Sequence, residues 1–249
     1  MSIDALSRLY ASYQLYPVNC FTAGTPVQKF RELYPHDHYS RDVDPFPAHH
    51  KYSGTSKGAD MPWWGRRYFG SERGRRVVLV SQDSLAPDAG SVVFWMHLFD
   101  NIATRIDLMS FSRRLDTPYQ TFRYASYDRM RRQMTEWGLD LDFVFITDAA
   151  KVYRKGSWRD RDFDRQRSRR LLKDEVELCR PDLIVLLGAA GLSLLRPELR
   201  YEAAVENGKY ISIGEVKSIV APFPIGQGLT QLNFAARMAT ATNLIRAYV

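Results

Sequence analysis

The sequence predicts an α/β fold, in which a parallel β-sheet is covered by helices on both faces. Four short apolar runs of strand length occur at residues 77–80, 143–147, 183–187 and 218–221. Segments with helical periodicity separate them, and strands that alternate with helices pair in parallel. Such strands are apolar throughout because both faces of the sheet are buried. The chain has 249 residues, of which 45% are hydrophobic, which fits one large domain.

Helices are expected between and around these apolar runs. The helical segments are 2–15, 26–33, 90–109, 127–137, 165–179, 189–195 and 229–248. Residues 35–62 are rich in Pro, Gly and Asp and show little periodicity, so we expect a long surface loop there. The chain is therefore divided into an N-terminal helical and loop extension over residues 1–60, at the rim of a pocket, and an α/β domain over residues 61–249.

The composition excludes several classes of protein. No run of eighteen apolar residues is present, and the N-terminal segment lacks the features of a secretory signal, so we expect no membrane association. Cys20 and Cys179 are too few for an iron–sulfur cluster or a disulfide framework, which favours a cytoplasmic location. The net charge of +7 suits a polyanion such as DNA. A basic protein without such a partner is the alternative.

Polar residues follow the predicted strands at their carboxyl ends. Gln82 and Asp83 follow the first strand, Asp148 the second, Gly188 the third and Pro222 the fourth. Ligands of parallel α/β sheets bind outside these ends, so the residues are expected around one crevice. For each aspartate alone, a helix cap or a turn is the competing interpretation. Their joint placement favours a functional site.

Four of the five histidines lie in the expected surface loop, and they are His36, His38, His49 and His50. They have neither cysteine partners nor a regular scaffold, which a metal site would need. Solvated or phosphate-facing histidines are therefore favoured, and we expect neither a metal nor another cofactor.

Four segments carry a resemblance to a known family. They are Ser81-Gln82-Asp83-Ser84, Gly90-Ser91-Val92-Val93-Phe94, FVFITDAAKVYR around the second strand, and Ala221-Pro222-Phe223-Pro224-Ile225-Gly226. In this order, within residues 62–249, they resemble the motifs of the uracil-DNA glycosylase superfamily. The resemblance implies a three-layer α/β/α sandwich with a central four-stranded parallel sheet. It also implies a monomeric, monofunctional DNA glycosylase that flips a nucleotide and hydrolyses its N-glycosidic bond, leaving an abasic site.

The resemblance assigns a role to each motif. Asp83 would be the catalytic carboxylate, which stabilises the oxocarbenium-like sugar and orients or deprotonates a water. Gln82 would contact the base, Phe94 would stack on it and Asp148 would read its edge. A core position in an apolar helix is the competing interpretation of Phe94. A protonated or turn-capping carboxyl group is the competing interpretation of Asp148.

Two departures from the family motifs bear on the substrate. Asp148 stands where the family has an asparagine, and an ionised carboxylate only accepts hydrogen bonds. It would repel O4 of uracil and accept from the N4 amino group of cytosine. Ala221 stands where the family has a histidine that donates to the base oxygen.

We therefore expect a modified cytosine as the target, such as the glucosylated hydroxymethylcytosine of phage DNA, because excision of ordinary cytosine would destroy the host genome. This target implies a role in antiviral defence. Excision of uracil in repair, or DNA binding without catalysis, are the alternatives.

DNA contacts are expected on two sides of the pocket. Phosphates would be bound after the second strand by Arg154, Lys155, Arg159 and Arg161, unless that segment is only a solvated charged face. After the fourth strand, Ile225 would fill the gap left by the flipped base, on a loop held rigid by Pro222 and Pro224. A turn with a buried isoleucine is the alternative. Trp63 and Trp64 suit either sugar contacts or core packing.

Overall fold

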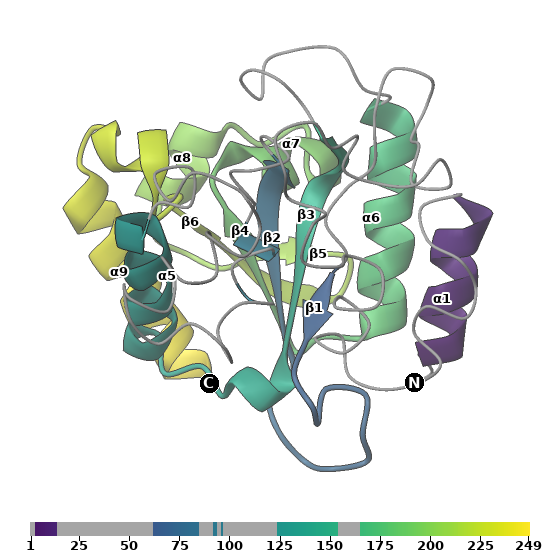
Figure 1. Ribbon diagram of the computed structural model, residues 1–249. Helices are drawn as coiled ribbons and strands as arrows, with labels where there is room; N and C mark the ends of the chain where they lie inside the picture. The colour runs from purple at the N-terminus through teal and green to yellow at the C-terminus, as the bar shows by residue number, and fades with distance from the viewer. Residues whose placement is uncertain (1–2, 14–61, 85–91, 94–95, 97–123, 154–164) are drawn as a thin grey trace.

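The computed structural model of the chain describes residues 3–13, 62–84, 92–93, 96, 124–153 and 165–249. Within these residues, one mixed β-sheet lies between helices on both faces (Figure 1). The strands are β1 (Trp63–Trp64), β2 (Val77–Ser84), β3 (Val144–Tyr153), β4 (Leu183–Leu187), β5 (Ile211–Ile213) and β6 (Val216–Ala221). The helices are α1 (Ile3–Ser12), α5 (Tyr124–Glu136), α6 (Arg165–Cys179), α7 (Ala189–Leu195), α8 (Tyr201–Glu206) and α9 (Phe234–Tyr248), with the 3-10 helices η4 (Leu141–Phe143) and η5 (Gly226–Thr230).

The strand order of the sheet is β1-β3-β2-β4-β6-β5, and its four inner strands run parallel to one another. The outer strands run antiparallel to their neighbours, β1 to β3 and β5 to β6. The predicted α/β class is confirmed. The four predicted strands are the parallel inner strands β2, β3, β4 and β6. A sheet of four strands is not confirmed, because the described sheet has two further, antiparallel strands at its edges. The outer strands contain two and three residues, too few to produce the apolar run by which a strand is found in a sequence.

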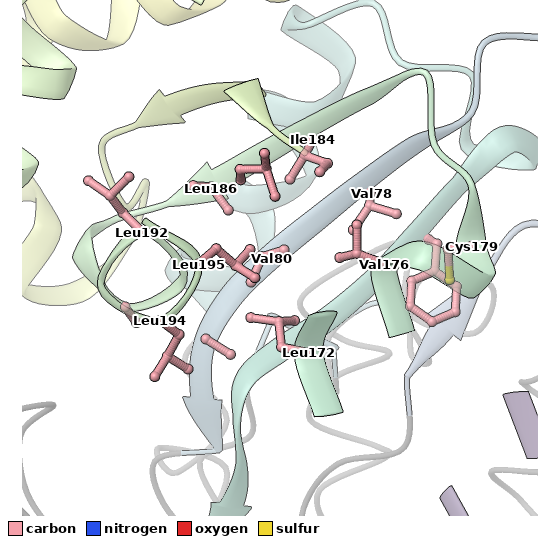
Figure 2. Packing of buried hydrophobic residues seen from close by; sticks show 14 of the residues in the cluster. Val78, Val80, Leu172, Val176, Cys179, Ile184, Leu186, Leu192, Leu194 and Leu195 are labelled. Carbon is pink, nitrogen blue, oxygen red and sulfur yellow. The ribbon is translucent and has the colours of Figure 1, made fainter. Parts of the chain in front are cut away.

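The sheet separates two buried apolar clusters, because successive side chains of a strand point to opposite faces. Val78 and Val80 of β2 pack with α1, α6, α7 and α8 in the first cluster. Figure 2 shows part of it, with Leu172 of α6 beside Val80. Val77 and Leu79 pack with α5 and α9 in the second cluster. The arrangement therefore has three layers, and each inner strand contributes to both cores.

The spacing of apolar residues explains why α6 forms where the sequence predicts it. Leu171, Leu172, Val176 and Cys179 recur at three- to four-residue intervals and are all buried against the sheet. α7 also has its predicted bounds, whereas α9 begins at Phe234 rather than at residue 229, because η5 and a turn precede it. Of the helix expected over residues 90–109, residues 92, 93 and 96 are described and are helical. The helix expected over residues 26–33 lies outside the described residues.

The two tryptophans of β1 are core residues, so the core-packing interpretation is confirmed. Trp63 and Trp64 are 8% and 5% exposed, and the Trp64 ring stacks on Phe145 of β3, with 6.0 Å between the ring centroids. Each buried aromatic ring of this size removes a large apolar area from water. β1 therefore covers the outer side of β3 and has no free aromatic face to offer a ligand.

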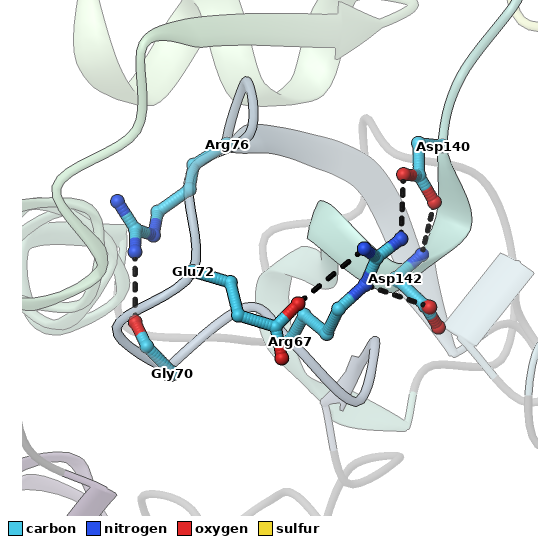
Figure 3. A network of polar contacts seen from close by, with 6 residues as sticks. All are labelled: Arg67, Gly70, Glu72, Arg76, Asp140 and Asp142. Atoms are coloured by element: carbon cyan, nitrogen blue, oxygen red, sulfur yellow. Dashed lines mark hydrogen bonds and ion pairs between the residues drawn. The ribbon is translucent and has the colours of Figure 1, made fainter.

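Two arginines, Arg67 and Arg76, hold the segment 65–76, between β1 and β2, at the amino edge of the sheet by hydrogen bonds (Figure 3). The Arg67 guanidinium donates to Asp140 and Asp142 of the opposite segment, each at 2.9 Å. Arg76 donates to two backbone oxygens at the start of its own segment, those of Tyr68 and Gly70. The Arg67 pairs are partly exposed, and exposed pairs contribute about 0–1 kcal/mol each, so they fix a conformation more than they stabilise the fold.

The N-terminal helix belongs to the first cluster rather than to a separate unit. Leu6 and Tyr10 of α1 are fully buried against α6. The Tyr10 hydroxyl donates to the buried carboxylate of Glu175 on α6, which also accepts from Thr147 of β3 at 2.9 Å. α1, α6 and β3 are thus joined by one carboxylate. The division of the chain at residue 61 stays a prediction, because residues 14–61 lie outside the described part.

We expect Tyr10→Phe to lower the free energy of unfolding by about 1–3 kcal/mol, because it removes a hydrogen-bond donor from the buried carboxylate of Glu175. Urea unfolding followed by circular dichroism measures the change. Tyr13→Phe is the matched control, since Tyr13 lies at the end of the same helix and is only half-buried. Equal stability of the two variants would contradict the importance of the Glu175 contact.

Candidate functional site at the carboxyl edge of the sheet

β2 and β3 extend beyond the carboxyl ends of their neighbours. The last pair between β2 and β4 is Val80↔Leu186, but β2 continues to Ser84 while pairing only with β3. Gln82 and Asp83 therefore lie within β2, and the prediction that they follow the strand is corrected. The apolar run in the sequence ends where these polar residues begin. The strand itself continues, because the backbone of β2 still pairs with β3. The register of β2 and β3 shifts between Asp83 and Ser84, which ends the regular part of this extension.

Asp148 is likewise an internal residue of β3 rather than the residue after a strand. It lies in register with Ser81 of β2. Leu187 of β4 is in register with Ala221 of β6, and the pair Val80↔Leu186 places Ser81 level with Leu187. Asp148, Ser81, Leu187 and Ala221 therefore form one row across the sheet. By strand alternation this row faces the second cluster, to which Leu187 and Ala221 belong.

The row combines a carboxyl group and a hydroxyl group with apolar neighbours. Asp148 and Ser81 are each 1% exposed, and Ala221 is fully buried. Carboxyl groups are rarely removed from water to this extent, since the ionised form loses its hydration. Glu175 is the comparable buried carboxyl group on the other face, and there it links three elements of the fold. Asp148 instead lies at the edge where α/β sheets bind ligands.

The Ser81 hydroxyl differs from the other buried hydroxyls of the sheet. Its Oγ is buried and has no hydrogen-bond partner among the described residues. The hydroxyls of Thr147 and Ser218, on β3 and β6, donate to Glu175 and to the backbone oxygen of Val216. The sequence places Ser81 in a motif but indicates no role for it. The register of β2 with β3 brings it beside Asp148.

The loop after β6 is fixed by close backbone contacts. The Gly188 amide donates to the Ala221 oxygen at 2.8 Å, and Gly188 has the left-handed φ of 73° that glycine adopts easily. A Cβ on Gly228 would lie 2.0 Å from the backbone oxygen of Phe223, so only glycine allows η5 to lie this close to the loop. The turns after β4 and β6 are thereby held together beside the row.

This loop contains three of the predicted site residues, Pro222, Pro224 and Ile225. The rings of Pro222 and Pro224 are buried, so their part is to hold the backbone. Ile225 is half-buried and packs against the second cluster. Its insertion into DNA stays a prediction.

Several of the predicted site residues cannot be placed. Outside the described residues lie Phe94, Arg154, Lys155, Arg159, Arg161, His36, His38, His49 and His50. The backbone of Asp83 is described within β2, one residue beyond the half-buried Gln82. Among the described residues, no three side chains of His, Cys, Asp or Glu gather as metal ligands.

A group of arginines at the start of α6 reaches the same edge of the sheet. Arg165 donates to Ser193 of α7 at 3.2 Å, and α7 follows the carboxyl end of β4, so α6 begins at this edge. Arg169 and Arg170 lie within two turns of that end, and neither forms a salt bridge with a described residue. Cations near a helix N-terminus oppose the helix dipole. The sequence analysis did not single out these arginines, because it favoured the basic residues of the segment before α6 as DNA contacts.

Leu232 is a further residue that the sequence did not single out. It is 76% exposed and lies in the short turn between η5 and α9. The turn is held by the Tyr201 hydroxyl, which donates to Gln231 at 2.7 Å, and by Asn233, which has a left-handed φ of 56°. An exposed leucine on a fixed turn beside the Pro222–Ile225 loop is suited to contact a partner.

Neither a scan against protein-family models nor a search of the curated proteins finds a match to this chain. None of the described helices combines the length and the apolar character that crossing a bilayer requires.

Proposed function

We propose that the protein is a DNA glycosylase that flips a modified cytosine out of the duplex and hydrolyses its N-glycosidic bond. The observation that carries the proposal is the buried carboxyl group of Asp148 on β3. Asp148 pairs in register with Ser81 of β2, and β2 also contains Asp83. Asp83 is two residues further along β2 than Ser81. Strand geometry therefore puts the Cα atoms of the two aspartates roughly 8 Å apart. A single nucleotide can span this separation, with its sugar at Asp83 and the far edge of its base at Asp148.

Asp83 acts on the sugar in this proposal. As the bond between C1′ and the base nitrogen breaks, the base leaves with the bonding electron pair and positive charge develops on the sugar. A carboxylate beside the sugar stabilises this charge and orients the water that attacks C1′. The water loses a proton, and the departing base takes one up from solvent. Because Ala221 offers no donor at the position of the family histidine, the carboxylate carries a larger share of the catalysis.

Asp148 selects the base. An ionised carboxylate accepts from the N4 amino group of a cytosine-type base, and it repels the O4 carbonyl of uracil. The discrimination is strong because Asp148 is 1% exposed, so a mismatched polar group cannot be compensated by water. Ala221 in the same row has a smaller side chain than the family histidine, and in this proposal the base enlarged by a sugar adduct uses the volume of the missing imidazole.

Two features suit a DNA duplex at this edge. Near the start of α6, Arg170 is exposed and Arg169 is half-buried. Neither forms a salt bridge with a described acidic residue, although Arg169 helps to lower the pKa of Glu198, and phosphates are attracted to such positive charge. Leu232 provides an exposed apolar side chain on a fixed turn, and side chains of this kind fill or wedge open a base stack. Both features lie outside the core packing, so their substitution leaves the fold intact.

The catalytic role predicts that Asp83→Asn abolishes base release, by a factor of at least about 100, while DNA binding is kept. Mass spectrometry of bases released from phage DNA with glucosylated hydroxymethylcytosine measures the activity, and a gel-shift assay measures binding. Asp174→Asn on α6 is the control and should behave as the wild type. Binding of DNA by the wild type without release of any base would instead favour a non-catalytic DNA-binding protein, which the absence of a donor at Ala221 would explain.

The selective role predicts that Asp148→Asn shifts the preference toward uracil, because an amide can both donate and accept. We expect the ratio of kcat/KM for uracil to that for the modified cytosine to rise by about tenfold or more. Duplexes with one modified base at a defined position measure the ratio. If the wild type released uracil and left the modified cytosine in place, the interpretation of Asp148 would be wrong.

The proposed DNA surface predicts that Arg169→Glu with Arg170→Glu weakens duplex binding. The plot of log affinity against log salt should become less steep by about 1 for each phosphate that the variant no longer binds. Fluorescence anisotropy at several salt concentrations measures both quantities. Arg131→Glu with Arg132→Glu is the matched control, because both arginines form ion pairs with Asp128 on α5. Equal effects of the two double variants would show that only the net charge matters.

A further inference from the structure

The unpartnered hydroxyl of Ser81 calls for a physical explanation. Its Oγ is buried in a residue that is 1% exposed, and it has no hydrogen-bond partner among the described residues. Buried polar groups almost always have a partner, since the loss of hydration is otherwise uncompensated. Exceptions are retained where a ligand supplies the missing partner. The hydroxyl therefore indicates a site that is complete only when occupied.

Two buried hydroxyls elsewhere in the fold have hydrogen-bond partners, whereas the indole N–H of Trp63 on β1, like the Ser81 hydroxyl, has none among the described residues. Ser218 on β6 is fully buried and donates to the Val216 oxygen at 3.2 Å. Thr242 on α9 accepts from the indole N–H of Trp137 at 3.1 Å. Ser81 is also a buried serine within a strand, but it faces the second cluster at the carboxyl edge, whereas Ser218 faces the first cluster. The two serines therefore differ both in the face of the sheet and in their distance from the candidate site.

The position of Ser81 relative to Asp148 defines what the ligand must offer. The two residues are register neighbours on adjacent parallel strands and face the same side of the sheet. Register neighbours have Cα atoms about 5 Å apart, so one planar group can touch both side chains. Asp148 accepts hydrogen bonds when ionised, and Ser81 can donate one. The acceptor Asp148 beside the donor Ser81 therefore complements a ligand that has a hydrogen-bond donor next to an acceptor on one edge.

We propose that Ser81 is a base-recognition residue, whose hydroxyl donates a hydrogen bond to the ring nitrogen N3 of a cytosine-type base while Asp148 accepts from its N4 amino group. This inference rests on the proposed function and specifies how the site binds its base. The edge of cytosine presents the N4 donor directly beside the N3 acceptor. Ala221 in the same row has no donor, so the hydrogen bond to the ring comes from β2.

The proposal has a consequence that a structural serine would not show. Removal of an unpaired buried hydroxyl relieves the free protein of a desolvated group, so Ser81→Ala should be as stable as the wild type or more stable. The same substitution removes a ligand contact and should weaken base binding about tenfold. Ser218→Ala should do the opposite, because its hydroxyl is satisfied within the protein and lies on the other face of the sheet. Ser81→Ala thus loses binding without losing stability, and Ser218→Ala loses stability without losing binding.

The test uses the full chain, with free 5-hydroxymethylcytosine as the probe. Isothermal calorimetry measures its affinity, and thermal unfolding without the probe measures stability. We expect about tenfold weaker binding and an unchanged or raised Tm for Ser81→Ala, and unchanged binding with a lowered Tm for Ser218→Ala. A lowered Tm with wild-type affinity for Ser81→Ala would overturn the inference. So would a wild type that does not bind the probe.

Base release from modified DNA separates this inference from the proposed function. If the wild type releases no base from any DNA, yet Ser81→Ala still weakens probe binding, the glycosylase proposal fails and base recognition stands. If Ser81→Ala binds the probe and releases base as the wild type does, while Asp83→Asn is inactive, the role of Ser81 fails and the glycosylase proposal stands.

Discussion

The pairing of β2 with β3 is the constraint on which the candidate site depends. These central strands continue as a two-stranded extension after β4 and β6 have ended. Backbone pairing holds the extension together with the buried side chains of Ala149 and Ala150 on β3, so the β2 positions can carry polar residues without loss of the strand. The register then determines which of these residues meet. A shift of one residue would turn Asp148 to the opposite face, where the first cluster fills the space.

The buried polar residues of the sheet divide into two kinds. On the face covered by α6, Glu175 accepts from Tyr10 and Thr147 and joins three elements. On the face covered by α5 and α9, Ser81 lies beside Asp148, and its hydroxyl is unsatisfied among the described residues. The first arrangement stabilises the fold, and the second leaves a buried hydroxyl unsatisfied, which costs free energy. Thr147 and Asp148 are adjacent in β3, so the satisfied network also fixes the strand that carries the candidate reader of the base.

The sequence predicted those elements whose stability comes from apolar burial. β4 and α6 have the predicted bounds, because uninterrupted apolar residues and a helical repeat mark them clearly. It failed at the polar end of β2, at the part of β3 that follows Asp148, and at the short outer strands. The aspartates of the candidate site were found because polar residues at strand ends are conspicuous. Ser81 was not found. Its hydroxyl is notable only because it has no hydrogen-bond partner among the described residues and because β2 and β3 pair in a register that places it beside Asp148. Neither fact can be read from the spacing of residues in the sequence.

The short outer strands have a consequence for how the molecule behaves in a crowded solution. A parallel sheet with bare edges exposes rows of backbone donors and acceptors that another chain can pair with. Here β1 and β5 cover the edges of the described sheet with two and three residues. A foreign strand that pairs with β1 or β5 would find only two or three residues along which to form a ladder. The shortness that hid these strands in the sequence thus limits edge-to-edge aggregation through them.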